Sequence, residues 1–239
     1  MEAELIPQRL AFYRQFVRQG DLCFDIGANI GNRTEIFLAL GGKVVAVEPQ
    51  NECAQQLKLR FGKSIELVRK ALGDKEGEAT IYISETSEIS SLSRDWIHAV
   101  SKSRFSNKEW KNKKQIPVST LDKLIETYGV PRFCKIDVEG YETEVLRGLS
   151  HSIPIISFEY TIPERVDQVS GCVALLSDIG KFEYNYTISE NTKMELSDWI
   201  SDIAIVDEIK RISDKCLFGD IYVRFIGSNN DDKQPISDR

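Results

Sequence analysis

Two short apolar runs, joined by a segment of helical length, constrain the fold of this chain more than any other feature. The first run, Leu22–Ile26, enters a glycine-containing turn, and the second, Lys43–Val47, ends at Glu48. Parallel strands need a crossover connection of about a dozen residues or more, which is usually a helix. The pattern therefore predicts a β-α-β unit, with the turn at the carboxyl end of its first strand.

The glycines of this turn distinguish two classes of adenosine cofactor. A nicotinamide site needs G-x-G-x-x-G, whose backbone packs against a pyrophosphate. The turn here reads G-x-x-x-G from Gly27 to Gly31, with Asn29 where the second glycine is expected. Asp25, two residues ahead, would repel a pyrophosphate but attract the ammonium and sulfonium groups of S-adenosylmethionine. Glu48 can bind ribose hydroxyls in either class.

Length, composition and charge favour a single α/β domain. The chain has 239 residues, of which 41% are hydrophobic, and its net charge is −6. We predict one domain over residues 1–228, with an N-terminal helix in 1–20 and a disordered tail over 229–239. The negative charge argues against nucleic acid as a partner. No run approaches the roughly 18 apolar residues of a membrane span, and no secretory leader opens the sequence.

The cysteines indicate a reducing compartment. They are odd in number and never spaced as C-x-x-C, and Cys23 and Cys134 lie inside apolar runs, where they resemble core residues. We therefore expect a cytoplasmic protein. The sequence carries no signal for an oligomeric state.

Strand and helix patterns alternate along most of the chain. Strands are predicted near residues 22–26, 43–47, 65–73, 79–83, 116–118, 132–137, 153–159, 182–188 and 220–225. Helices are predicted near residues 4–19, 31–40, 51–61, 119–129, 141–148, 164–179 and 195–212. This order predicts a Rossmann-like parallel sheet with helices on both faces and an extra N-terminal helix. Ligands of such sheets bind beyond the carboxyl ends of the strands.

Charged residues gather at one of these strand ends. Lys135–Glu142 holds three acids and a lysine in eight residues, and alternation places Lys135, Asp137 and Glu139 on one face. Such charges are costly to bury unless paired, so Lys135 either organises the sheet, with Asp137 or Glu159 as its partner, or serves a functional site. For methyl transfer to a hydroxyl, Asp137 and Glu139 are candidate bases.

A metal site is a weaker interpretation of the same acids. Asp137, Glu139 and Glu159 could offer hard oxygen ligands to Mg²⁺. The sequence has no cluster of histidine and cysteine ligands. The sequence therefore allows Mg²⁺ as a cofactor but does not favour it, and we assign no metal ligands.

Two segments are candidates to cover a substrate, residues 84–114 and 189–215. Six of the thirteen residues from Lys102 to Lys114 are Lys or Arg. This basic cluster is either a solvated surface or a site for a phosphate or nucleotide carrier of a sugar. His98 is a candidate base. Nearby aromatic residues either close the site or belong to an ordinary core, and these are Trp96, Phe105 and Trp110.

Taken together, these motifs resemble the FkbM family of S-adenosylmethionine-dependent methyltransferases. The matching pieces are 24–31, 47–49, 71–73, 90–92, 118–122, 135–142, 145–148 and 158–159. The resemblance covers about residues 20–160, and the K-I-D-V-E-G-x-E run is its most specific part.

The resemblance implies an O-methyltransferase acting on hydroxyls of sugars or secondary metabolites, with a seven-stranded sheet whose last strand is antiparallel. The predicted cofactor site consists of Asp25, Gly27, Ala28, Asn29, Gly31, Glu48, Pro49, Ala71, Leu72 and Asp137. The predicted catalytic residues are Asp137, Glu139, Lys135 and His98. The predicted substrate contacts are Ser91, Trp110, Lys111 and Glu159.

Three other functions stay open on the sequence. A nicotinamide oxidoreductase would bind NADH, which the missing G-x-G and Asp25 disfavour. A non-catalytic module would bind the cofactor without turnover. A nucleic-acid methyltransferase is disfavoured by the acidic charge.

Overall fold

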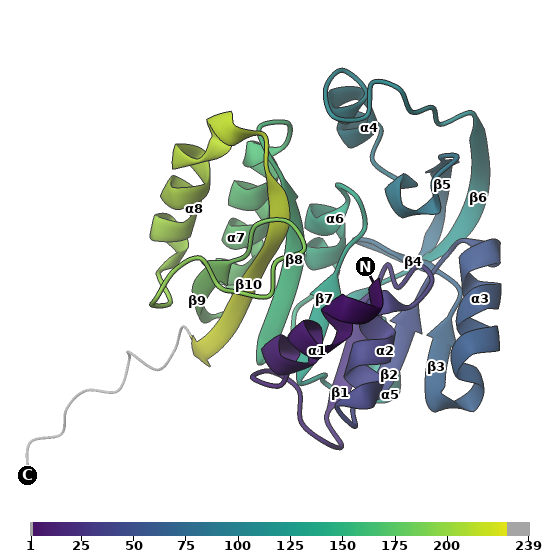
Figure 1. Cartoon of the computed structure of the whole chain (residues 1–239), viewed down its shortest axis with the longest axis horizontal. Coiled ribbons are helices and arrows are strands. Elements are labelled where there is room, and N and C mark those ends of the chain that lie inside the picture. Colours follow the sequence, from purple (N-terminus) through teal and green to yellow (C-terminus); the bar gives the residue numbers. More distant parts are fainter. Residues whose placement is uncertain (1, 229–239) are drawn as a thin grey trace, which may run out of the picture.

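Seven strands form the central sheet of the computed structural model, which describes residues 2–228. Their order is β3-β2-β1-β7-β8-β10-β9 (Figure 1). The strands are β1 (Leu22–Ile26), β2 (Lys43–Val47), β3 (Ile65–Val68), β7 (Phe133–Ile136), β8 (Ile155–Thr161), β9 (Lys181–Tyr186) and β10 (Phe218–Gly227). The pairs among β3, β2, β1, β7 and β8 are parallel, whereas β10 runs antiparallel to both of its neighbours. The predicted Rossmann-like sheet with an antiparallel last strand is confirmed.

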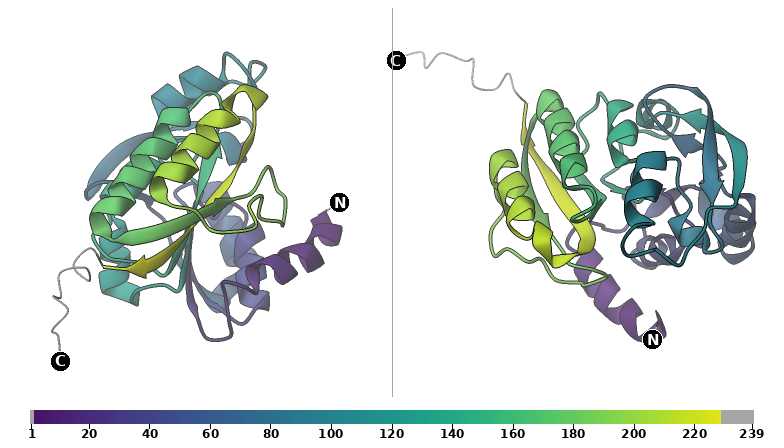
Figure 2. Two further views of the ribbon diagram at one scale, coloured as in Figure 1. Left: turned by 90° about the vertical axis from the view of Figure 1, so that its left-hand side faces the viewer. Right: turned by 90° about the horizontal axis from the view of Figure 1, so that it is seen from above.

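Helices cover both faces of this sheet. They are α1 (Glu2–Tyr13), α2 (Asn32–Ala39), α3 (Asn51–Phe61), α5 (Leu121–Tyr128), α6 (Glu142–Arg147), α7 (Val166–Ile179) and α8 (Asp202–Arg211). Apolar residues of α1, α2 and α3 share one buried cluster with the sheet, and those of α5, α6, α7 and α8 share the other. Figure 2 shows α7 and α8 side by side on their face. Cys23 and Cys134 are fully buried in these clusters, as predicted.

The N-terminal helix is held to the sheet by aromatic rings. Phe12 of α1 packs edge-on against Tyr222 of β10, and the Tyr13 hydroxyl lies 3.3 Å from that of Tyr222. Phe16, three residues after the end of α1, stacks on Tyr222 and on Phe133 of β7. Such ring contacts add to the free energy gained by burying the rings. These contacts fix the position of α1, whose Arg9 lines a cavity.

A second, three-stranded sheet in the order β4-β6-β5 was not predicted. It consists of β4 (Ala71–Leu72), β5 (Gly77–Ile83) and β6 (Asn112–Ser119). The strand predicted over residues 65–73 therefore forms two strands, β3 in the central sheet and β4 in the small sheet. The strand predicted at 116–118 begins four residues earlier, at Asn112. The four residues added at the start of β6 are exposed and polar, so they carry no apolar alternation. Their strand conformation comes from backbone pairing with β5.

Residues 84–111 join β5 to β6, and we call this segment the lid. It contains α4 (Arg94–Val100), whose Trp96 and Val100 are buried with Ile89. The lid lies beyond the carboxyl ends of the parallel strands (Figure 1). The basic cluster, Lys102 to Lys114, follows this helix in turns and irregular backbone and then enters β6.

The second candidate covering segment, residues 189–215, contains most of the β9–α8 connection (residues 187–201) and α8 itself. Backbone hydrogen bonds pair Tyr184 with Ile200, and the helix predicted from residue 195 begins only at Asp202. None of the helices in the described part of the chain is long and apolar enough for a membrane span. The tail predicted over 229–239 lies outside the described residues.

Candidate functional site

The glycine turn after β1 packs directly on the segment after β7. Gly27 has a φ of 81°, and a Cβ there would lie 1.7 Å from the Asp137 carbonyl oxygen. Only glycine fits such an approach. Asn29 also adopts left-handed backbone, with φ 48°. The turn therefore brings the two sequence motifs into contact.

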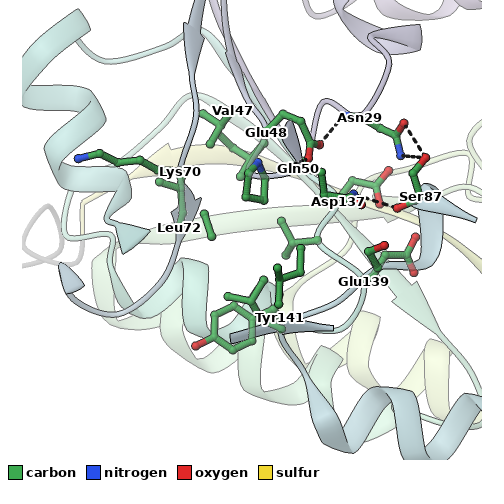
Figure 3. A pocket seen from close by; sticks show the side chains of 18 of the residues that line it. Asn29, Val47, Glu48, Gln50, Lys70, Leu72, Ser87, Asp137, Glu139 and Tyr141 are labelled. Atoms are coloured by element: carbon green, nitrogen blue, oxygen red, sulfur yellow. Dashed lines mark hydrogen bonds between the residues drawn. The ribbon is translucent and has the colours of Figure 1, made fainter. Parts of the chain in front are cut away.

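A first cavity lies between this turn, the end of β2 and the small sheet (Figure 3). Its wall contains seven of the predicted cofactor residues, and these are Gly27, Asn29, Glu48, Pro49, Ala71, Leu72 and Asp137. Apolar wall is added by Ile26, Val47, Ile81, Leu92 and Val138. The combination of apolar walls with a few polar groups is typical of small-molecule sites.

Glu48 is the buried acid of this cavity. Its carboxylate accepts hydrogen bonds from the backbone N–H of Asn29 (2.9 Å) and of Gln50 (2.7 Å). Burial raises the pKa of Glu48 to about 7, although both backbone hydrogen bonds oppose the shift. The carboxylate is thus fixed in orientation while lining the cavity.

A second cavity of about 610 Å³ adjoins the first, since Gly27, Asn29, Asp137 and Glu139 line both. Asp25 and Ala28 of the predicted cofactor site lie in its wall. Asp25 is 2% exposed and accepts a 2.5 Å hydrogen bond from the Thr34 hydroxyl. Burial raises the pKa of Asp25, against the effect of Thr34 and the Lys135 charge. Gly31 precedes α2, and neither described cavity wall includes it.

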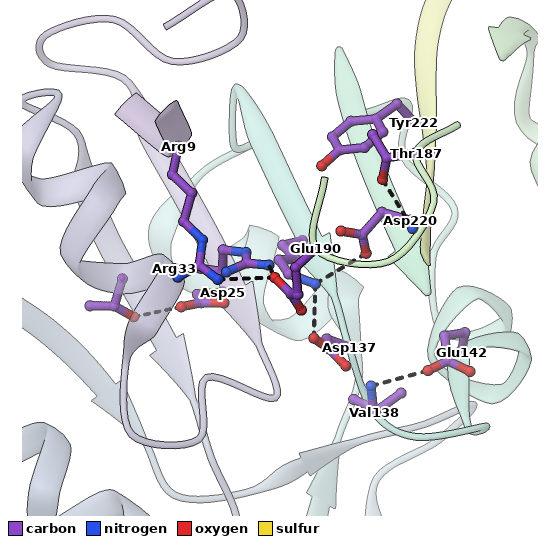
Figure 4. A network of polar contacts seen from close by, with 12 residues as sticks. Arg9, Asp25, Arg33, Asp137, Val138, Glu142, Thr187, Glu190, Asp220 and Tyr222 are labelled. Atoms are coloured by element: carbon purple, nitrogen blue, oxygen red, sulfur yellow. Dashed lines mark hydrogen bonds and ion pairs between the residues drawn. The ribbon is translucent and has the colours of Figure 1, made fainter. Parts of the chain in front are cut away.

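Lys135 lies at the centre of a buried ion network, between Asp137 and Asp220, which Figure 4 shows. Its ammonium donates to Asp137 (2.9 Å) and to Asp220 of β10 (3.2 Å). Burial alone would lower the pKa of Lys135, but the two carboxylates hold it well above its usual range. Of the two partners considered from the sequence, Asp137 is the one bound. Asp220 was missed because its strand is 85 residues away in sequence.

Three carboxylates converge beside this network. One oxygen each from Asp137, Glu139 and Glu159 lies within 4.8 Å of the others. Burial raises the pKa of Glu139 and of Glu159 well above the usual range, and the neighbouring carboxylates add to both shifts. Such a cluster either retains protons or holds a hard cation, for which carboxylate oxygens are suitable ligands.

Glu142, the last acid of the motif, organises the loop before it. It is buried and accepts hydrogen bonds from the backbone N–H of Val138 (3.1 Å) and Gly140 (3.3 Å). Its other oxygen contacts the Gln168 amide. Through these contacts it holds Glu139 in left-handed backbone, with φ 54°.

The lid closes over the same loop. The Ser91 hydroxyl donates to the Glu139 carbonyl oxygen (2.6 Å), and a Cβ at Gly140 would lie 2.3 Å from Trp96. Trp96 and Phe105 face the second cavity. Trp110 instead packs edge-on against Trp96 and donates to the Ile89 carbonyl oxygen (2.7 Å). Ser91 and Trp110 therefore support the lid from within.

Two predicted site residues lie away from the cavities. Neither His98 nor Lys111 is among the described residues that line them. His98 is exposed on α4, and Lys111 is 66% exposed and paired with Glu109 and Glu85. From the basic cluster, Arg104 reaches the second cavity. Sequence reasoning missed Arg9, Arg33 and Glu190, which also line it, because they come from three distant elements.

Comparison with known proteins agrees with this arrangement. The Methyltransferase FkbM domain description matches residues 25–188. This chain belongs to the FkbM methyltransferase family. The match includes the glycine turn, the lid and the acidic motif, and so covers most of the cavity wall.

One curated relative is "Hexuronic acid methyltransferase AglP" of Haloferax volcanii, which is 26% identical over 147 residues. The match covers 59% of this chain and 54% of that protein, so the chain spans about half the length of this relative.

Solved methyltransferase structures are similar over most of the chain. A precorrin-6y C5,15-methyltransferase from Geobacter metallireducens is 12% identical, with a TM-score of 0.48, covering 93% of this chain and 87% of that one. An O-methyltransferase from Bacillus cereus in complex with SAH is also 12% identical, with a TM-score of 0.47 and coverages of 94% and 81%.

Proposed function

We propose that this family member is an S-adenosylmethionine-dependent O-methyltransferase whose acceptor is a sugar or another polyhydroxylated metabolite. The observation that carries the proposal is the pair of adjoining cavities. One has apolar walls and a buried acid, and the other is lined by three carboxylates, of which Asp137 and Glu139 also line the first. The name of the matched relative, a hexuronic acid methyltransferase, supports a sugar as acceptor.

The first cavity fits an adenosine. Glu48 can accept hydrogen bonds from both ribose hydroxyls through lone pairs that the backbone leaves available, and Val47, Leu72 and the other apolar walls can pack on the base. Asp25 provides negative charge toward the amino-acid part.

Bound S-adenosylmethionine supplies an electrophilic methyl group on a positively charged sulfur. The residues of this chain then have to orient an acceptor hydroxyl and remove its proton. Asp137 and Glu139 lie where the two cavities meet, so either can accept that proton. Lys135 holds Asp137 in place. Closure by the lid excludes water, which favours a reaction that neutralises opposite charges.

The test is cofactor binding followed by transfer. We expect calorimetry to detect binding of S-adenosylmethionine and S-adenosylhomocysteine but no binding of NADH. We also expect at least one member of a panel of sugars and glycans to take up labelled methyl from S-adenosylmethionine. The Asp137→Asn variant should retain cofactor binding and lose transfer. Binding of NADH in place of S-adenosylmethionine would refute the proposal, as would binding without transfer to any polyhydroxylated acceptor.

A further inference from the structure

We propose that Arg9 and Arg33 form a binding site for an oxyanion carried by the acceptor, and that Glu190 occupies this site until the acceptor displaces it. The inference rests on the proposed function and names a chemical class for its substrate. Both arginines and Glu190 line the second cavity, the same space that the three carboxylates face.

The two arginines are buried cations. The side chains of Arg9 and Arg33 are 9% and 14% exposed, and both donate through Nη2 to the same oxygen of Glu190, Arg9 at 3.1 Å. The Nε–H of each is buried without a hydrogen-bond partner in the described part of the chain. Buried donors are costly to leave unpaired, so these groups have capacity for a further acceptor. A guanidinium binds carboxylate and phosphate through two parallel hydrogen bonds.

Glu190, the partner of both arginines, is exposed and lies on the connection between β9 and α8. The Glu190 side chain is 55% exposed, on the β9–α8 connection, and reaches down to cations held by α1 and α2. Although burial opposes it, Arg33, Lys135 and Arg9 hold the pKa of Glu190 below its usual range, so it is ionised at neutral pH. Within this group of three side chains, two guanidinium groups share one carboxylate, so one positive charge is in excess.

The position of the pair suits an acceptor that bears both a hydroxyl and an oxyanion. Figure 4 shows Arg33 and Glu190 beside Asp25 and near Asp137. An oxyanion at the arginines would therefore place the rest of a sugar toward the carboxylates. The basic cluster of residues 102–114 does not provide such an oxyanion site. Arg104, its member in the wall of the second cavity, is already bound to Glu164 and to two backbone carbonyls.

A matched series of sugars tests the site by binding, without reliance on turnover. We would titrate glucuronate, glucose 1-phosphate and glucose into the protein with S-adenosylhomocysteine. Glucuronate or glucose 1-phosphate should bind at least about tenfold more tightly than glucose, as expected for charge-assisted hydrogen bonds. Whichever of the two charged sugars binds more tightly shows whether the site prefers a sugar carboxylate or a phosphate.

The Glu190→Gln variant makes the sharper test, since it should gain affinity. A tethered carboxylate competes as if present at about millimolar concentration, so its removal should tighten binding of the charged sugar by about tenfold and leave glucose unchanged. Arg33→Gln should abolish the preference for charge. The controls are Glu195→Gln, on the same connection, and Arg14→Gln, just after α1, because both residues are exposed.

Equal binding of the three sugars, or an unchanged affinity in Glu190→Gln, would overturn the site. A protein that binds no S-adenosylhomocysteine would instead count against the proposed function. The sugar titrations, repeated without cofactor, keep these two failures distinguishable.

Discussion

Asp25 shows how a single residue can limit the choice of ligand. Its carboxylate is buried at the turn and lines the second cavity, where burial disfavours the charged form. A cationic ligand would recover part of this free energy, whereas an anionic ligand would increase the cost. The Thr34 hydroxyl fixes the orientation of the carboxylate toward the cavity.

The Asp25→Asn variant removes the charge and retains an oxygen for Thr34. We expect the affinity for S-adenosylmethionine to fall by about tenfold or more, the loss typical of a partly buried charge-assisted contact. Calorimetry measures this, with circular dichroism to verify folding. Asp74→Asn, at an exposed position, is the control. Undiminished affinity would mean that the turn binds something other than a cationic donor.

Glu142 makes the stability depend on pH. Burial raises the pKa of this carboxyl from the usual 4.5 to about 7, so the folded state binds a proton that the unfolded state releases. The free energy of unfolding should therefore fall as the pH rises from 4.5 to 7, by up to about 3 kcal/mol from this group. Urea unfolding across this range should show a flatter profile for Glu142→Gln. An identical slope would exclude Glu142 as the source.

Among the elements, those with an apolar period were predictable and those stabilised by distant partners were not. The strands of the parallel sheet carry buried apolar runs, so the sequence located them and the residues at their carboxyl ends. The polar half of β6 has no such period. Arg9 and Asp220 join the site through tertiary contacts with Glu190 and Lys135, which no local pattern reports.

The contact between the turn and the end of β7 is tested by two glycines with similar backbone. Gly27→Ala would place a Cβ 1.7 Å from the Asp137 carbonyl, so we expect a loss of about 3 kcal/mol or more. Gly20→Ala, at φ 86° with nothing within 4 Å, should lose only about 1 kcal/mol. Thermal unfolding compares the two. Equal losses would show that the turn and β7 can separate freely.

Across the whole molecule, the lid connects the small sheet to the far half of the central sheet. Arg104 of the lid donates to the Ile162 carbonyl (2.8 Å), to the Leu217 carbonyl (3.1 Å) and to Glu164 (2.9 Å). These partners lie after β8 and before β10. Arg104 thus attaches the lid to the segments that flank β8 and β10. The wall of the second cavity contains Arg104 together with residues of the glycine turn and of the acidic loop after β7.

Loss of this connection should affect the acceptor and not the cofactor. In Arg104→Gln the lid loses its ion pair with Glu164, so hydrogen exchange over residues 86–110 should rise and KM for the acceptor should increase by about tenfold. Affinity for S-adenosylmethionine should change little, because Arg104 is absent from the described wall of the first cavity. Lys102→Gln, two residues away and exposed, is the control. If cofactor affinity fell as much as acceptor affinity, loss of the Arg104 contacts would also disturb the lid residues that line the first cavity, such as Leu92, and the division of the site into a cofactor part and an acceptor part would be wrong.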